Sequence, residues 1–441
     1  MSDINESLTS LAATISETTK AITSVLENNG YPTPSFSEDG PLEYPNTPEI
    51  MDLRFKLRDA VIDLYRLAMG PSDMAFIHPL YLNYDALILD TFNQFNFWEA
   101  VPLGGSATVS EVAQKTTLPE SLVRRLLAYA IPSRIFAHGP PGTDTIVHTS
   151  LSACFVKKPL FRPWLIHNFE DVRPGVVHAP ESFRKFCAGR EKETQEREEC
   201  GFALADHDRL GRPSNMWEYV SREVEGKPKG FRSQTFAKAM QAASSASSMK
   251  TEGFLQTGYD WQGLGEATVV DVGGSSGHDA LTIARAFPKL NFIVQDLPET
   301  EAQFREKIPE TEASRIKFEA RDFFGPQNTK GDLYMLKRVL HDWSDKYAVR
   351  IIAPLLPHLK AGSRLLLCES VMPPADAPLP STMRRMLACS DLQMLCSVSG
   401  LERTLEQWKA LLQQVDPGLA VTYVSNVQGS INNFIEVKFT G

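Results

Sequence analysis

The residues best suited to chemistry in this 441-residue chain stand together in the stretch YMLKRVLHDWSD, residues 334–345. A strand-like apolar run ends there in His341, followed by an aspartate, a tryptophan and a second aspartate. A neutral imidazole at the end of a strand can take the proton of a substrate hydroxyl as that oxygen forms a bond. A phenol has a pKa near 10, so ionising it at pH 7 costs about 4 kcal/mol, and a general base avoids this cost. His341 is therefore a candidate general base.

The neighbours of His341 also have structural interpretations. His341 itself could be a core or capping histidine, with Asp342 as the N-cap of the next helix. Asp342 and Asp345 are expected to cap or orient that helix instead of acting chemically. Trp343 fits a core anchor as well as a wall of a substrate pocket.

A second candidate site is the glycine-rich stretch VVDVGGSSGHDALTIARAF. Gly273, Gly274 and Gly277 allow a tight turn between a strand and a helix that begins near residue 278. Asp296 ends the following strand, where a carboxylate can accept hydrogen bonds from two ribose hydroxyls. Because no lysine or arginine stands near the turn to neutralise a diphosphate, a nucleoside cofactor such as S-adenosylmethionine fits better than a dinucleotide. The alternative is a glycine turn that serves only the fold.

The metal-ligating residue types show no metal-site spacing. The nine histidines form no HxH or HxxxH cluster, and the six cysteines form no CxxC pair. The sequence therefore predicts no metal site.

Alternating strands and helices must position these residues. Strand-like runs at 267–272, 291–296, 315–320, 332–340 and 364–371 are separated by amphipathic helices such as 345–359, and a hairpin is expected at the C-terminus. This pattern predicts an α/β, doubly wound domain with a mostly parallel sheet over residues 263–441.

The N-terminal half is predicted to be helical. Residues 1–50 are expected to form an arm, with a helix over 4–26 whose apolar stripe includes Ile4 and Leu8, ended by Asn29-Gly30 and followed by a proline-rich tether. Such an arm can be a dimer arm or a clasp onto the body of its own chain.

Residues 51–160 predict a winged helix, and 161–262 a helical connecting region. In the winged helix, Ser110 is expected as an N-cap, a turn falls at Thr117, and strand-like runs lie at 135–136 and 145–149. In the connecting region, the polar run 190–199 is expected to be a solvated helix face.

The composition limits the possible partners. A formal charge of -9 and a pI near 5.6 argue against a nucleic-acid or anionic-membrane partner, and 42% hydrophobic with 22% charged residues is the balance of a globular protein. The N-terminus lacks the layout of a signal peptide, and no apolar run is long enough to span a membrane. A reduced, cytoplasmic protein is expected.

Six motifs in order carry a family resemblance, namely DVGGSSG, DLP, RDFF, LKRVLHDWSD, LLLCES and LERT. Together they resemble the plant-type and fungal S-adenosylmethionine-dependent O-methyltransferases, from about residue 60 onward. The resemblance implies a Rossmann-like class I methyltransferase domain behind an N-terminal helical winged-helix dimerisation domain, and hence a homodimer.

The same resemblance implies roles for individual residues. Gly273 would lie against the methionine end of the cofactor and Asp296 would hold its ribose. Asp322 and Phe323 would border the adenine, and Lys337 would reach the cofactor from the fourth strand. The carboxylates that orient His341 would be Glu369 and Glu402, of which Glu369 is read with more ease from the sequence.

The acceptor pocket is expected along the helix 384–396, with Met386 and Met394 on one face. The family places a methionine near Met394 against an aromatic acceptor, although methionines at this spacing also suit a plain core. Many relatives carry an asparagine shortly before the LERT glutamate, whereas here 397–399 is Ser-Val-Ser, which leaves the acceptor open.

Three functions therefore compete. The leading one is O-methylation of a hydroxyl on a small aromatic or polyketide-like metabolite. In the second, suggested by fungal relatives, the cofactor is a fixed charge for dehydration or pericyclic ring closure, with Lys337, Arg338 or His341 polarising a carbonyl. The third is a non-catalytic winged-helix binding protein, which the acidic charge disfavours.

Overall fold

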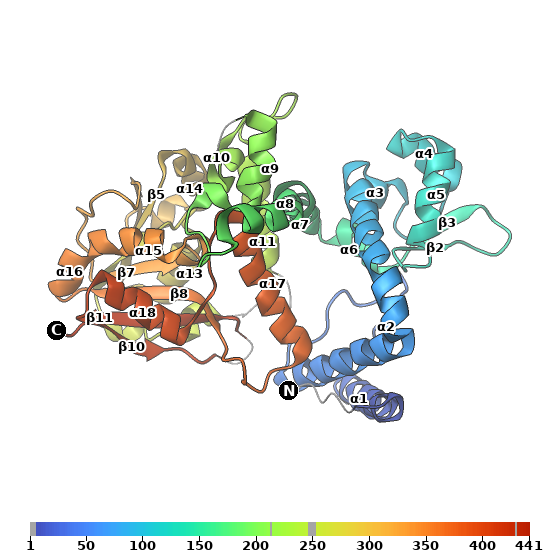
Figure 1. Cartoon of the computed structure of the whole chain (residues 1–441), viewed down its shortest axis with the longest axis horizontal. Helices are drawn as coiled ribbons and strands as arrows, with labels where there is room; N and C mark the ends of the chain where they lie inside the picture. The colour runs from blue at the N-terminus through green and yellow to red at the C-terminus, as the bar shows by residue number, and fades with distance from the viewer. Residues whose placement is uncertain (1–5, 212–213, 246–252, 428–429) are drawn as a thin grey trace. The chain divides into compact units, whose positions relative to one another are not determined.

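The computed structural model describes residues 6–211, 214–245, 253–427 and 430–441 (Figure 1). The chain forms two compact units. The first, called the N-terminal unit, comprises residues 1–174, 217–249 and 378–386. The second, called the sheet unit, comprises residues 175–216, 250–377 and 387–441.

The sheet unit is built on one mixed β-sheet. Its strands follow the order β10-β11-β8-β7-β4-β5-β6, with β9 paired to β8. Strands β8, β7, β4, β5 and β6 run parallel, whereas β10 and β11 form an antiparallel hairpin that joins β8. The strands are β4 (Ala267–Val272), β5 (Leu290–Asp296), β6 (Ile316–Ala320), β7 (Leu333–Lys337), β8 (Arg364–Met372), β9 (Arg403–Thr404), β10 (Leu419–Val424) and β11 (Asn432–Phe439). The predicted mostly parallel sheet and terminal hairpin are confirmed.

Strand β7 is shorter than the predicted run 332–340. It ends at Lys337 because Arg338 adopts a left-handed backbone with φ 53°. The chain therefore leaves the sheet three residues before His341, which lies in a short 3-10 turn, Leu340–Asp342.

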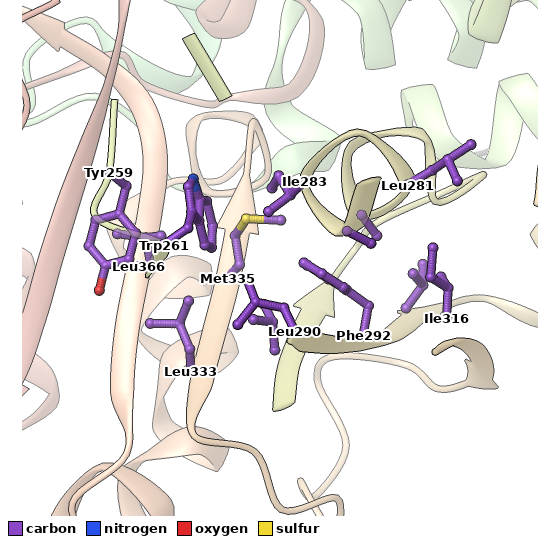
Figure 2. Close-up of a cluster of buried hydrophobic side chains, with 14 of the residues drawn as sticks. Tyr259, Trp261, Leu281, Ile283, Leu290, Phe292, Ile316, Leu333, Met335 and Leu366 are labelled. Carbon is purple, nitrogen blue, oxygen red and sulfur yellow. The ribbon is translucent and has the colours of Figure 1, made fainter. Parts of the chain in front are cut away.

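Helices cover the sheet, whose central strands are almost continuously apolar. Figure 2 shows the buried hydrophobic cluster, which includes Trp261, Phe292 and Met335 together with Leu281 and Ile283 of the helix α13. Elsewhere α15 contacts α18, and α18 contacts β10. The helices assigned wholly or in part to this unit are α8 (Arg173–Ser182), α9 (Gly201–Leu210), α10 (Met216–Ser221), α12 (Phe254–Thr257), α13 (His278–Ala286), α14 (Glu301–Lys307), α15 (Asp345–Ile352), α16 (Leu356–Lys360), α17 (Ser381–Val398) and α18 (Leu405–Val415).

The N-terminal unit contains a long kinked helix and a small antiparallel sheet of order β1-β3-β2. Helix α2 bends at Gly70, which has φ 70° and precedes Pro71. The helices are α1 (Leu8–Asn28), α2 (Pro48–Gln94), α3 (Phe97–Ala100), α4 (Val109–Thr116), α5 (Glu120–Ala130), α6 (Ser150–Lys157), α7 (Phe161–Ile166) and α11 (Phe231–Ser245), and the strands are β1 (Ala107–Thr108), β2 (Phe136–His138) and β3 (Thr145–His148). Two helices followed by a hairpin agree with the predicted winged helix.

Helix α1 packs on its own chain. Its buried residues Ile22 and Leu26 contact Ile50 at the start of α2. Asn29 caps the helix and Gly30 has φ 65°, as expected. Ile4 of the predicted stripe lies outside the described residues, and Leu8 is 52% exposed.

Two local predictions were wrong. The N-cap of α4 is Thr108, not Ser110, because Thr108 and Glu111 form a reciprocal capping box. Residues 190–199 are not a helix face. They form an irregular segment ending in a 3-10 turn, Arg197–Glu199, and Gln195 and Glu196 bind residues of the 344–347 region.

Within the described part of the chain, every helix is too short or too polar to cross a membrane.

Candidate active site

The glycine bend follows directly from β4. Gly273 and Gly277 have φ 79° and 72°, in the left-handed region that glycine tolerates. A Cβ on Gly273 would lie 2.9 Å from Cγ2 of Val339, and one on Gly274 would lie 2.4 Å from Oδ2 of Asp271. Gly277 caps α13. The predicted tight turn is confirmed, and it places bare backbone against the segment that leads to His341.

Asp296 lies at the end of β5, next to this bend. Its Oδ2 accepts a hydrogen bond of 2.8 Å from the backbone N–H of Ser275, and its Oδ1 accepts one of 2.7 Å from the N–H of Leu297. Burial raises the pKa of Asp296, and these two donors oppose the rise. The carboxylate is thereby held at the carboxyl edge of the sheet, where a ribose would lie.

Asp322 and Phe323 follow the next strand, β6. Oδ1 of Asp322 accepts a hydrogen bond of 2.9 Å from the N–H of Phe324. The rings of Phe323 and Phe324 meet the face of Trp343 edge-on, with centroid distances of 5.8 and 5.0 Å. Trp343 is 5% exposed, so it anchors an aromatic cluster beside the predicted adenine position.

Lys337 lies at the end of β7 and pairs with a carboxylate of α13. Its Nζ is 2.8 Å from Oδ2 of Asp279. Burial lowers the pKa of Lys337, but the charge and hydrogen bond of Asp279, together with Cys368 and Asp271, outweigh burial and raise the pKa above its usual value, so the lysine stays charged. Burial, and then Asp279, raise the pKa of the neighbouring Asp271 to about 8. Oδ2 of Asp271 is buried without a hydrogen-bond partner among the described residues.

His341 is buried between two carboxylates. Its Nδ1 lies 3.2 Å from Oε1 of Glu402 and its Nε2 lies 3.4 Å from Oδ1 of Asp342. Burial alone raises the pKa of Glu402, yet the hydrogen bond with His341 and the charge of Arg338 lower it to about 2. Glu402 is therefore ionised at neutral pH and holds the Nδ1 side of the ring.

Glu369 accepts hydrogen bonds from backbone N–H groups, and its other oxygen, Oε2, has no hydrogen-bond partner among the described residues. Its Oε1 accepts from the N–H groups of Val339 and Leu340 at 3.0 and 2.8 Å. Burial raises the pKa of Glu369. Glu402, which was the harder of the two carboxylates to identify from the sequence, contacts the imidazole. Glu369 binds the backbone of the turn that carries His341.

Arg403 was not predicted as a site residue. Its side chain is fully buried and donates to the carbonyls of Leu340 and Trp343 at 2.9 and 2.8 Å, while its Nε donates to Asp345 at 2.9 Å. The N-cap of α15 is Ser344, so the expectation that Asp342 or Asp345 caps this helix was wrong. Asp345 binds Arg403 instead, and Asp342 faces the ring of His341. The sequence signal that could have identified Arg403 was its place in the LERT motif, directly after the predicted Glu402.

Two further contacts fix the same turn. The N–H of Leu401 donates to the carbonyl of His341 at 2.9 Å, and a Cβ on Gly400 would lie 2.3 Å from that oxygen. On the other side, Ser344 donates to the carbonyl of Gln195 at 2.8 Å. Arg403, Leu401 and Gln195 therefore all bind the turn that carries His341, which restricts the movement of the ring.

The predicted pocket residues Met386 and Met394 both lie on α17 and are half-buried. Met386 belongs to the N-terminal unit and Met394 to the sheet unit, so their roles stay predictions. Among the described residues, no group of three or more His, Cys, Asp or Glu side chains is placed to hold a metal ion.

This arrangement combines a bend that fits a nucleoside cofactor with an oriented imidazole. Nε2 of His341 can accept a proton while Glu402 stabilises the resulting charge. Val339 links the two parts, because it touches the Cβ position of Gly273 and its N–H binds Glu369.

Residues 204–416 match the model of the O-methyltransferase domain. The chain is 33% identical over 405 residues to the O-methyltransferase lcsG of Purpureocillium lilacinum, covering 90% of this chain and 85% of that protein. It is 33% identical over 445 residues to the O-methyltransferase VdtC of Byssochlamys spectabilis, covering 98% and 97%.

Solved structures share the fold. The crystal structure of OxaC matches with a TM-score of 0.75 at 20% identity, covering 98% of each chain. The structure of LepI in complex with SAM matches with a TM-score of 0.71 at 18% identity, covering 97% of this chain and 99% of that one.

Proposed function

The chain belongs to the O-methyltransferase family, and from this premise we propose that it methylates a hydroxyl of a small aromatic or polyketide-like secondary metabolite, with His341 as general base. The cofactor is S-adenosyl-L-methionine. The observation that carries the proposal is the ordered pair of His341 and Glu402, 3.2 Å apart, beside the glycine bend.

The residues at the bend fit this cofactor. A side chain at Gly273 would collide with Val339, so only glycine fits between β4 and the segment that leads to His341. The buried Oδ2 of Asp271, which has no partner among the described residues, offers an acceptor for the ligand beside this bend. In the proposal Gly273 lies against the methionine end and Lys337 reaches the cofactor from β7. Asp296 holds the ribose, and Asp322 and Phe323 border the adenine. The bound cofactor supplies an electrophilic methyl group.

His341 accepts the hydroxyl proton at Nε2 as the oxygen becomes nucleophilic. Glu402 is ionised and lies 3.2 Å from Nδ1, whereas Asp342, whose pKa burial raises, lies 3.4 Å from Nε2. The neutral ring therefore carries its hydrogen on Nδ1 and has its lone pair at Nε2. Glu402 then stabilises the imidazolium without accepting its proton, since its pKa is about 2. Glu369 and Arg403 keep the turn in place while the charge develops.

We further propose a homodimer in a cytoplasmic location. Large apolar side chains at helical spacing after the kink of α2 are exposed, namely Phe76 at 75%, Leu80 at 44% and Leu87 at 45%, and an apolar helix face of this kind is costly unless covered. All six cysteines are free thiols, which suits a reducing compartment. Sedimentation of the wild type and of Phe76→Glu tests the dimer, which the charge should dissociate; a wild-type monomer would contradict it.

The test of function is a reaction of the purified protein with S-adenosylmethionine and a set of phenolic metabolites, followed by mass spectrometry. The proposal predicts a product heavier by one CH₂ group and an equal amount of S-adenosylhomocysteine. A product that has lost water or is only an isomer, with the cofactor unchanged, would support the dehydration or pericyclic alternative and overturn the methyl-transfer proposal.

A further inference from the structure

Arg338 stands where β7 leaves the sheet, three residues before His341. Its φ of 53° is unusual for a residue with a side chain, and its backbone N–H donates to the carbonyl of Cys368 at 3.0 Å. Its Nη1 lies 3.1 Å from both Ser370 Oγ and Glu402 Oε1. The left-handed backbone is thus accompanied by side-chain contacts that bring a permanent cation to the site.

One oxygen of Glu402 receives three donors. Oε1 is approached by Arg338 Nη1 at 3.1 Å, by Ser390 Oγ at 2.8 Å and by His341 Nδ1 at 3.2 Å. The other oxygen, Oε2, is buried without a hydrogen-bond partner among the described residues. Because a carboxylate oxygen offers about two lone-pair sites, the three donors compete for it. Arg338 and Ser390 therefore weaken the hold of Glu402 on a protonated ring.

The competition for Glu402 matters because the charged groups around His341 determine the pKa of its ring. Asp342, Glu402 and Glu369 are negative or titratable groups that favour the imidazolium, and Arg338 is the cation that opposes them. Burial and then Arg338 lower the pKa of His341, whereas the three carboxyl groups raise it, with a net rise above 6.5. A ring that is already protonated cannot accept a substrate proton.

We propose that Arg338 is a positioning residue that limits the protonation of His341 near neutral pH, by occupying Glu402 and by opposing the carboxyl groups around the ring. The proposal deepens the proposed function and rests on His341 as the base. Arg338 Nη1 and His341 Nδ1 lie 3.1 and 3.2 Å from the same oxygen, so the two nitrogens are at most about 6.3 Å apart. A charge at about this distance displaces a pKa by about one unit.

The test compares Arg338→Met and Arg338→Lys with the matched control Arg305→Met, whose side chain is 75% exposed on α14. His341 is titrated by NMR of ring-labelled histidine in the cofactor-free protein, with its signal assigned by its loss in His341→Ala. The pH profile of kcat/KM is measured in parallel. Arg338→Met should raise the pKa of His341 by about one unit and move the acid limb equally, which lowers kcat/KM about tenfold below that limb and little above it.

Arg338→Lys should restore most of the shift because it retains the charge, and Arg305→Met should match the wild type. A loss of activity that is equal at every pH, with the His341 titration unchanged, would overturn the proposal. If Arg338→Met does not fold, Ser390→Ala provides the second test: it removes a competing donor and should raise the pKa of His341, and no change there would overturn the shared-oxygen argument.

The general-base role of His341 and the role of Arg338 are tested separately. If His341→Ala retains the acid limb, the general-base assignment is wrong, whatever Arg338 does. If the limb belongs to His341 but does not move in the Arg338 variants, only the role of Arg338 is wrong.

Discussion

Replacing Glu402 by glutamine keeps the shape of the side chain that contacts Nδ1 of His341 and removes its charge. The pKa of Glu402 falls from its usual 4.5 to about 2, which corresponds to about 3 kcal/mol of favourable interaction of the ionised form. This energy is divided among His341, Arg338 and Ser390, so the interaction of Glu402 with the imidazolium contributes about 1 to 3 kcal/mol. Because the side chain is fully buried, solvent screening reduces the value little.

Glu402→Gln should therefore lower kcat by about tenfold to a hundredfold, since the imidazolium forms only as the proton is transferred. The acid limb of the pH profile should also move to lower pH, opposite to the shift expected for Arg338→Met. The assay is the formation of S-adenosylhomocysteine at saturating substrates between pH 5 and 9. The control is Glu406→Gln on α18, whose side chain is 79% exposed. A Glu402→Gln enzyme with wild-type kcat at every pH, or with its acid limb at higher pH, would refute the reasoning.

Three further predictions concern pH and the supporting residues. Because the pKa of His341 is raised, the wild-type kcat/KM should fall as the pH drops through a value above 6.5, and a profile flat from pH 9 to 5.5 would contradict this. Gly273→Ala places a Cβ 2.9 Å from Val339 in a left-handed residue, so it should cost about 1 to 2 kcal/mol in unfolding free energy and weaken cofactor binding in calorimetry; wild-type values for both would be evidence against a tight bend. Arg403→Met leaves the carbonyls of Leu340 and Trp343 without their buried donor and should lower the free energy of unfolding by about 3 to 5 kcal/mol in urea, whereas a loss below 1 kcal/mol would show that the turn holds without it.

The sheet and the glycine bend could be predicted because their signals are local. Apolar runs mark β4 and β7, and the glycines at 273 and 277 occupy positions that need a positive φ. The pairing of β7 with β4 then places the segment leading to His341 beside the bend.

The details of the turn could not be predicted because they depend on residues distant in sequence. The left-handed Arg338, which shortens β7, contacts Glu402 from 64 residues away, and Arg403 contacts Leu340 from 63 away. The segment near Gln195 has a helix-like charge pattern, but its polar groups bind residues about 150 positions later. Thr108 displaced Ser110 as the cap of α4 for a local reason, since Glu111 completes a box only with Thr108.

The most direct measurement of the central claim compares His341→Ala with the wild type in transfer of a labelled methyl group from S-adenosylmethionine to a phenolic acceptor, with cofactor affinity determined on the same preparations. The account predicts that transfer falls by about a hundredfold or more while the dissociation constant of the cofactor stays within about twofold of the wild type. Wild-type transfer by His341→Ala would contradict it.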